Sequence, residues 1–106
     1  MIERLLNMIG LARRAGKVST GAFVCEKMIK WRRARLVILA HDASENTKKT
    51  VTDSCKFYNI RVIEISDMES LGHITGGGDR AVVSVNDNNF AKAISDIYIS
   101  SETEKG

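Results

Sequence analysis

Residues 36–47 read Leu-Val-Ile-Leu-Ala-His-Asp-Ala-Ser-Glu-Asn-Thr, and this stretch decides the fold. Its first five residues are apolar without interruption, which predicts a strand that is buried on both faces. His41 and Asp42 end the strand, and Ser44 is a good N-cap for a helix from about residue 45 to residue 58. A strand buried on both faces needs helices on both sides of its sheet, so the stretch indicates a layered α/β domain.

The N-terminal segment continues the alternation of helices and strands. Apolar side chains from residue 2 to residue 12 recur with helical spacing, and Gly16 is placed to end that helix in a left-handed turn. Thr20 can cap a second helix. The apolar positions of this second helix are Val24, Met28 and Trp31, with Cys25 and Ile29 beside them.

The C-terminal half follows the same order. Strands are predicted at residues 61–65 and 81–85. Between them, Ser66-Asp67-Met68-Glu69 fits a capping box that opens a short helix ending near Gly72. A flexible loop is expected at residues 76–79, and Asp87 can cap a last helix.

Together these elements predict an α/β fold, namely a three-layer α/β/α sandwich around a small mixed sheet of about four strands. The fourth strand is a short pairing segment near Lys17 and Val18. Residues 1–99 are expected to form a single domain, and residues 100–106 are expected to form a flexible tail.

Length and composition argue against several classes of protein. With 106 residues the chain has the size of one domain, and its longest apolar run, residues 36–40, is far too short for a membrane span. Residues 1–4 do not begin a secretory signal, because an acidic residue comes early and no long apolar stretch follows. Cys25 and Cys55 are too few for a disulfide scaffold or a zinc knuckle, which predicts a reduced protein in the cytoplasm.

Basic residues are concentrated in the first half of the chain. Residues 1–50 hold eleven Lys or Arg and four Asp or Glu, whereas residues 51–106 hold five and nine, and the net charge is +3. This asymmetry predicts one basic face, which suits nucleic acid and a solvated surface about equally. Arg13 and Arg14 also have a structural reason, since they fall in the last turn of a helix, where cations suit its dipole.

Motifs for catalysis or cofactor binding are weak or missing. Gly76-Gly77-Gly78 lacks the Lys-Ser/Thr of a phosphate-binding loop, and no clear strand leads directly into it. His41 and Asp42 end a strand where open α/β sheets bind ligands, but no nucleophile motif accompanies them, so an exposed loop pair is favoured. We therefore expect a protein that is not an enzyme and that uses no metal and no cofactor.

Several segments together carry a resemblance to a known family. They are Leu11-Ala12-Arg13-Arg14-Ala15-Gly16-Lys17, then Thr20-Gly21 and Lys27, then Ala40-His41-Asp42-Ala43-Ser44-Glu45-Asn46-Thr47, with Leu71-Gly72 further on. In these segments, and from about Ile2 to Ile97 as a whole, the chain resembles the YlxQ-type bacterial proteins of the superfamily of ribosomal proteins L7Ae and L30e. The resemblance implies the α/β/α fold, no catalysis and an RNA-binding edge, because members of that superfamily typically bind kink-turn RNA.

The resemblance also points to a site, from which this chain departs at two places. In that superfamily the second helix begins Gly-x-Asn-Glu-x-x-Lys, and its Asn and Glu read tandem sheared G·A pairs in the kinked RNA. Gly21 and Lys27 match this pattern, but Phe23 and Val24 stand at the Asn and Glu positions. Kink-turn binders also carry an apolar loop after Leu-Gly, where this chain has residues 75–79, Thr-Gly-Gly-Gly-Asp. Both departures argue against kink-turn specificity.

The sequence allows two roles for Phe23. Its ring can stack on an unpaired base and replace the missing polar contacts, or it can be a core or staple residue of the helix start. Lys27 and Lys30 share its helical face, at spacings of four and seven residues.

The first hypothesis is a non-catalytic RNA-binding protein associated with the ribosome or translation. It binds structured RNA, for example ribosomal RNA, at the N-terminus of the second helix, contacts ribosomal proteins and is a monomer. The candidate RNA-binding residues are Arg13, Arg14, Lys17, Gly21, Phe23, Lys27, Lys30, Arg32 and Arg33. The alternative is a protein-interaction adaptor of the translation machinery that has lost RNA recognition and docks a partner through Phe23 and Val24.

Overall fold

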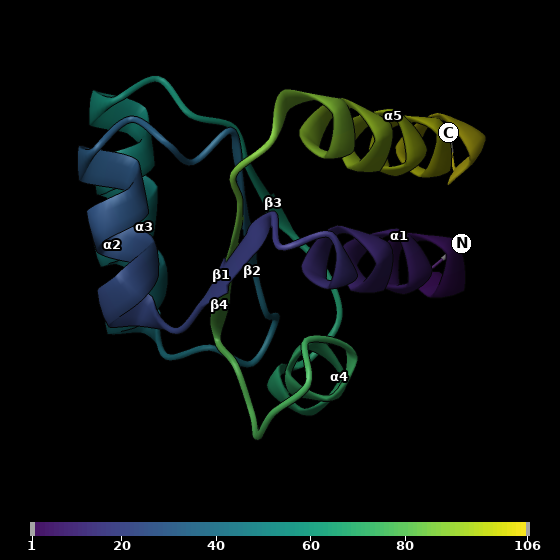
Figure 1. The fold of residues 1–106 in the computed structure, drawn as a ribbon, viewed down its shortest axis with the longest axis horizontal. Helices are drawn as coiled ribbons and strands as arrows, with labels where there is room; N and C mark the ends of the chain where they lie inside the picture. The colour runs from purple at the N-terminus through teal and green to yellow at the C-terminus, as the bar shows by residue number, and fades with distance from the viewer. Residues whose placement is uncertain (1, 106) are drawn as a thin grey trace.

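The computed structural model describes residues 2–105, and it describes the side chains of residues 2–101. Helices and strands alternate along the chain, which confirms the predicted α/β fold (Figure 1). The helices are α1 (Ile2–Arg14), α2 (Ala22–Lys30), α3 (Glu45–Phe57), α4 (Met68–Ile74) and α5 (Asn88–Lys105). The strands are β1 (Val18–Thr20), β2 (Leu36–Leu39), β3 (Val62–Glu64) and β4 (Val82–Val85).

The strands form one mixed, four-stranded sheet in the order β1-β4-β2-β3. β4 runs antiparallel to both of its neighbours, with Val85 paired to Val18 and to Leu36, whereas β2 and β3 are parallel. The expected four-stranded sheet, with its short strand after Lys17, is confirmed. This register gathers the starts of β1, β2 and β3 at one end of the sheet, which we call the Arg35 end. The opposite end, where β1 leads into α2, is the Gly21 end.

Helices cover both faces of the sheet because the strands bury side chains on both faces. All four residues of β2 are buried. Leu36 and Ile38 join a core beneath α1, α4 and α5, while Val37 and Leu39 join a second core beneath α2 and α3. The three layers are visible in Figure 1, where α2 and α3 lie to the left of the sheet and α1 and α5 to its right.

Several predicted helix ends are confirmed. Ser44 caps α3, and its Oγ accepts a hydrogen bond from the Thr47 amide at 3.1 Å. Asp87 accepts from the Phe90 amide at 2.9 Å at the start of α5. Gly16 (φ 74°) takes the predicted left-handed turn after α1, and Asn59 (φ 58°) takes a similar turn after α3.

The second helix differs from its predicted cap and apolar face. Thr20 is the last residue of β1, and Gly21 is the N-cap residue of α2, because pairing with β4 keeps Thr20 extended. Cys25 and Ile29 are the buried positions of α2. Val24 and Trp31 are exposed, because the face of α2 that meets the core is centred on Cys25 and Ile29.

The fourth helix also differs from its prediction in both of its ends. Asp67 rather than Ser66 caps α4, accepting from the Ser70 amide at 2.7 Å, and this hydrogen bond lowers the pKa of the Asp67 carboxyl. α4 continues past Gly72 to Ile74. Gly72 is buried inside the helix, where a side chain would collide with the carbonyl of Gly78.

The last helix continues past residue 99 and ends at Lys105. Gly106 lies outside the described residues, and the flexibility of residues 100–106 stays a prediction. Among the described helices, none is both long enough and apolar enough to cross a membrane.

Candidate functional site

The start of α2 is open at the Gly21 end of the sheet. The Gly21 amide donates to the carbonyl of Val82 in β4 at 3.0 Å, which fixes the turn from β1 into α2. Gly21 has φ 91° and ψ 146°, a conformation that residues with side chains rarely adopt. A Cβ added there would meet no described atom within 4 Å. Glycine is therefore required by its backbone conformation, and the space in front of it is open to a ligand.

The first turn of α2 differs electrostatically from the first turns of α3, α4 and α5, which have side-chain caps. Among the described residues no side chain caps α2, and its first turn contains no acidic residue. Ser44, Asp67 and Asp87 cap α3, α4 and α5 in contrast. The helix dipole of α2 is thus uncompensated at its positive end, an arrangement that favours an anion such as phosphate.

Phe23 lies on the outer face of α2 with 73% of its surface exposed. This exposure is inconsistent with a role in the core or in a helix staple. Lys27 lies one turn later, with Nζ 4.4 Å from the centre of the Phe23 ring. Phe23, Lys27 and Lys30 line an open depression on this face of α2. Glu26 lines it as well, but its Oε2 accepts from Ser54 Oγ at 3.0 Å, which anchors this carboxylate toward α3.

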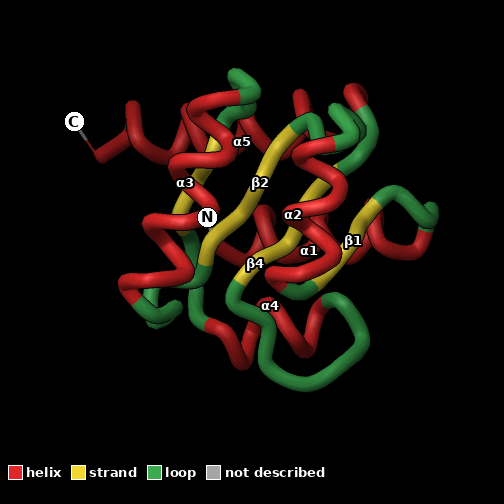
Figure 2. Tube along the Cα trace, turned by 90° about the vertical axis from the view of Figure 1, so that its left-hand side faces the viewer, coloured by secondary structure: helices red, strands yellow, loops and turns green. Residues whose placement is uncertain are grey.

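The glycine loop follows α4, and the chain continues from it into β4, as Figure 2 shows. Because β4 begins at Val82, whose carbonyl accepts from the Gly21 amide, this loop reaches the Gly21 end of the sheet. It is anchored to α4, since the Gly77 amide donates to the carbonyl of Gly72 at 2.9 Å. Two arginines flank it. The Arg13 guanidinium packs against Gly76, and a Cβ added to Gly77 would lie 3.1 Å from Nη2 of Arg80. Arg80 is not among the residues that the sequence predicts for the site, although it lies near the glycine loop in the sequence, two residues after Gly78.

Comparisons with known proteins agree with this architecture. The model of the ribosomal protein L7Ae/L30e/S12e/Gadd45 family matches residues 3–95. The chain belongs to this family. The chain is 41% identical over 87 residues to the "RNA-binding protein YlxQ" of Bacillus subtilis (strain 168), covering 82% of this chain and 87% of that protein. It is 39% identical over 90 residues to the protein of the same name from Enterococcus faecium, covering 85% and 86%.

Two solved structures extend the family comparison. A protein of unknown function from Bacillus halodurans superposes with a TM-score of 0.84 at 34% identity, covering 87% of this chain and 93% of that one. The 15.5kD RNA-binding protein of Giardia lamblia superposes with a TM-score of 0.78 at 20% identity, covering 93% and 85%, and this likeness concerns the fold. Membership in the L7Ae/L30e family agrees with the expected α/β/α fold and with the expectation that the chain is not an enzyme.

The candidate residues of this family member do not form the single basic face that the charge pattern suggested. Phe23, Lys27 and Lys30 follow Gly21 along the outer face of α2. Arg13 lies beside the glycine loop, and Arg14 is exposed in the last turn of α1. Lys17 and Arg33 line a groove at the Arg35 end of the sheet, together with Arg35. Arg32 lies over the ring of Tyr58 at 5.2 Å. Residues close in sequence are thus divided between two ends of the sheet.

The pair His41-Asp42 has structural contacts rather than the geometry of a catalytic pair. Asp42 Oδ1 accepts from the Met68 amide at 2.9 Å and so ties the end of β2 to the start of α4. Lys48 Nζ donates to the His41 carbonyl and to Glu64 Oε1, both at 2.7 Å, and the bond to Glu64 raises the pKa of Lys48. Among the described residues, no cluster of His, Cys, Asp and Glu is suited to hold a metal ion.

The two cysteines are buried thiols on neighbouring helices. Burial raises the pKa of Cys25 to about 11 and that of Cys55 to about 12. Both thiols therefore stay protonated at neutral pH and are poor nucleophiles.

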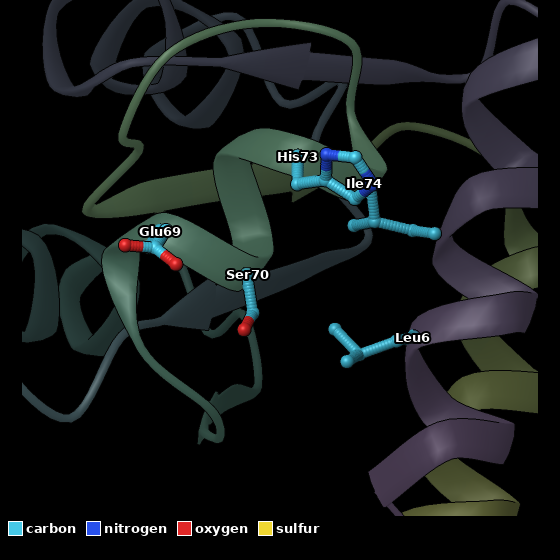
Figure 3. Close-up of a pocket in the computed structure, with 5 residues that line it drawn as sticks. All are labelled: Leu6, Glu69, Ser70, His73 and Ile74. Carbon is cyan, nitrogen blue, oxygen red and sulfur yellow. The ribbon is translucent and has the colours of Figure 1, made fainter.

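A cavity of about 390 Å³ lies between α1 and α4 (Figure 3). Its lining residues are Leu6, Glu69, Ser70, His73 and Ile74. None of the candidate RNA-binding residues lines it. The Glu69 carboxylate would repel a phosphate, so this cavity is separate from the candidate site.

Proposed function

We propose that the protein binds structured RNA through the start and the outer face of α2. The observation that carries this proposal is the open helix start at Gly21, which has no side-chain cap among the described residues and is followed by the exposed Phe23 ring and Lys27. Phosphate groups suit the free amides and the lysines, and the ring suits an unpaired base. The names of the two curated relatives support RNA as the ligand.

The proposed RNA contacts rely on phosphate and stacking rather than on polar recognition of base pairs. Phe23 and Val24 have no side-chain hydrogen-bonding groups, so they cannot read tandem G·A pairs as an Asn-Glu pair would. Arg13 and Arg80 beside the glycine loop add two cations near the same end of the sheet. We therefore propose strong salt dependence and little preference for a kink-turn over other structured RNA.

The cellular setting belongs to the same proposal. Membership in a ribosomal protein family supports association with ribosomal RNA and ribosomal proteins during translation. We propose that the protein acts there as a monomer in the cytoplasm.

A binding titration tests the proposed function. A kink-turn RNA and a matched duplex without the G·A pairs are titrated at two salt concentrations. The double variant Lys27→Ala/Lys30→Ala should bind both RNAs about tenfold more weakly at low salt, with a salt slope lower by about 1.8, since each phosphate contact contributes about 0.9.

The control variant Lys49→Ala/Lys92→Ala removes the same charge from exposed positions of α3 and α5, where each lysine pairs with an aspartate four residues later. It should bind RNA almost as the wild-type protein does. Equal losses in both variants would show that only net charge matters. No binding of either RNA by the wild-type protein would refute the proposal.

A second candidate function is favoured by one observation. Phe23 and Val24 are both exposed, at 73% and 41%, and form an apolar patch on α2 that a protein partner can cover. Purification from cells before and after nuclease treatment separates the two functions. A partner set that survives nuclease and is lost in a Phe23→Ala variant would favour the adaptor over the RNA-binding protein.

A further inference from the structure

A second basic surface lies at the opposite end of α2 from Gly21. The chain leaves α2 through Trp31 and turns into β2, with Arg32 in a left-handed conformation (φ 59°). The Arg35 amide donates to the carbonyl of Val85 at 2.8 Å, which holds this turn against the end of the sheet. Because the turn is short and anchored, Arg32, Arg33 and Arg35 are presented together at one end of the molecule.

Two open grooves flank this turn, and Arg35 lines both of them. The larger groove, of about 540 Å³, is also lined by Lys17 and Arg33. The smaller groove, of about 230 Å³, is lined by Arg32 and Tyr58. Neither set of lining residues contains an aspartate or a glutamate. The grooves therefore offer a continuous positive surface that suits the backbone of a nucleic acid.

The cations of this surface are not neutralised within the described part of the chain. The ion pairs among the described residues involve the basic groups of His41, Lys48, Lys49 and Lys92, and all four lie on other surfaces. The Arg32 guanidinium lies over the face of the Tyr58 ring, 5.2 Å from the ring centre, and this contact leaves its charge unneutralised. The arginines and Lys17 therefore keep their charge available for an external anion.

Exposed aromatic rings border the same surface. Trp31 is 61% exposed and Phe57 is 80% exposed. They stand at the ends of α2 and α3, which lie side by side and end together in Figure 1. Phe57 also contacts Tyr58 edge-on, with ring centres 4.9 Å apart. Exposed rings among unpaired arginines are typical of surfaces that bind single strands, in which unstacked bases are accessible.

We infer that this end of α2 binds single-stranded RNA, with Arg33, Arg35 and Lys17 on phosphates and Trp31 stacked on a base. The inference rests on the proposed function for the nature of the ligand and adds a second site to it. α2 has nine residues and is about 14 Å long, so one RNA molecule can contact the Gly21 end with a folded part and this end with a flanking strand.

The test uses the fluorescence of Trp31, which is the only tryptophan in the chain. A single-stranded oligouridine of about twelve nucleotides is titrated into the full chain at low salt. Stacking should quench the tryptophan emission, and a duplex RNA of the same length should quench it much less. A glutamate peptide of equal charge serves as the competing anion.

Two variants locate the contacts. Arg33→Gln/Arg35→Gln should weaken oligouridine binding about tenfold and lower the salt slope by about 1.4, since each single-strand phosphate contact contributes about 0.7. The control Lys49→Gln/Lys92→Gln carries the same net charge and should bind as the wild-type protein does. The Trp31→Ala variant should bind oligouridine about fivefold to a hundredfold more weakly. Its binding is measured by the fluorescence anisotropy of labelled oligouridine, because the variant has no tryptophan.

The outcomes separate this inference from the proposed function. Binding of structured RNA that depends on Lys27 and Lys30, without quenching of Trp31 by oligouridine, would overturn the second site alone. Quenching by the glutamate peptide in place of RNA would also overturn it, and so would equal losses in the arginine and lysine variants. Quenching that depends on Arg33 and Arg35 would support the second site even if the structured RNAs failed to bind at Gly21.

Discussion

Helices α2 and α3 lie side by side on one face of the sheet and contribute similar side chains to the same core. Cys25 and Ile29 from α2 meet Val51 and Cys55 from α3, and all four are buried. Their starts differ. α3 is capped by Ser44 and has an acidic residue in its first turn, whereas α2 begins at Gly21 with neither feature among the described residues. Two helices that share a core can thus differ at their N-termini, with α3 capped by its own side chain and α2 open to a ligand.

The largest expected difference is in the reactivity of the two thiols in the shared core. Both Cys25 and Cys55 should react with a thiol reagent at least about a thousandfold more slowly in the native protein than in denaturant, because both are fully buried and a domain of about 5 kcal/mol stability opens rarely. Rapid native reaction of either thiol would show that its helix is not firmly packed.

The raised pKa values of the same thiols make the free energy of unfolding depend on pH. Their folded pKa values, about 11 and about 12, lie above the ordinary value of 9.0, so the unfolded chain loses its thiol protons first as pH rises. The thiol contribution is complete below about pH 8.5 and decreases as pH rises toward 12. In a Cys25→Ala/Cys55→Ala variant, the fall in unfolding free energy above pH 9 should be smaller.

A core truncation in α2 should have the next largest effect. Ile29→Ala should reduce the free energy of unfolding by about 2–5 kcal/mol, because Ile29 is fully buried between the helix and the sheet. Urea denaturation measures the change. Thr52→Ala on the exposed side of α3 is the control and should change stability by less than about 0.5 kcal/mol. A similar loss in both variants would contradict the packing described.

Substitution of Gly21 should affect both stability and binding. Gly21→Ala should cost about 1–3 kcal/mol, because alanine must adopt the unusual conformation at φ 91°, and it should also weaken RNA binding at the helix start. Gly78→Ala is a matched control, since Gly78 has no positive φ and an added Cβ there meets no described atom within 4 Å. Wild-type stability in Gly21→Ala would show that the helix start adopts another conformation.

The smallest effect is expected at the capped start of α3. Ser44→Ala should reduce stability by about 1 kcal/mol, because the Thr47 amide loses its side-chain acceptor. Ser44→Asp should restore most of that stability. RNA affinity should be the same in all three proteins. A loss of affinity in Ser44→Ala would mean that the starts of both helices contact RNA and that the contrast between them is wrong.

Local signals in the sequence predicted much of the fold. The apolar run at residues 36–40 and the Ser44 cap depend on neighbouring residues alone, and both are found as predicted. The errors lie where a distant segment competes with a local preference. Thr20 can cap a helix in isolation, but its pairing with Val83 keeps it in β1. Ser66 begins a capping-box pattern, but its carbonyl accepts a hydrogen bond from the distant His41 amide and its φ is 61°, so Asp67 caps α4 instead.

The candidate site was less predictable, because it depends on which surface each side chain reaches. Periodicity and composition are enough to predict the alternation of helices and strands, the buried β2 strand and the basic character of the first half. The exposure of Phe23, and the position of Arg33 and Arg35 at the opposite end of α2 from Gly21, become visible in the folded chain. Helix length and strand register, rather than distance along the chain, determine which charges lie together.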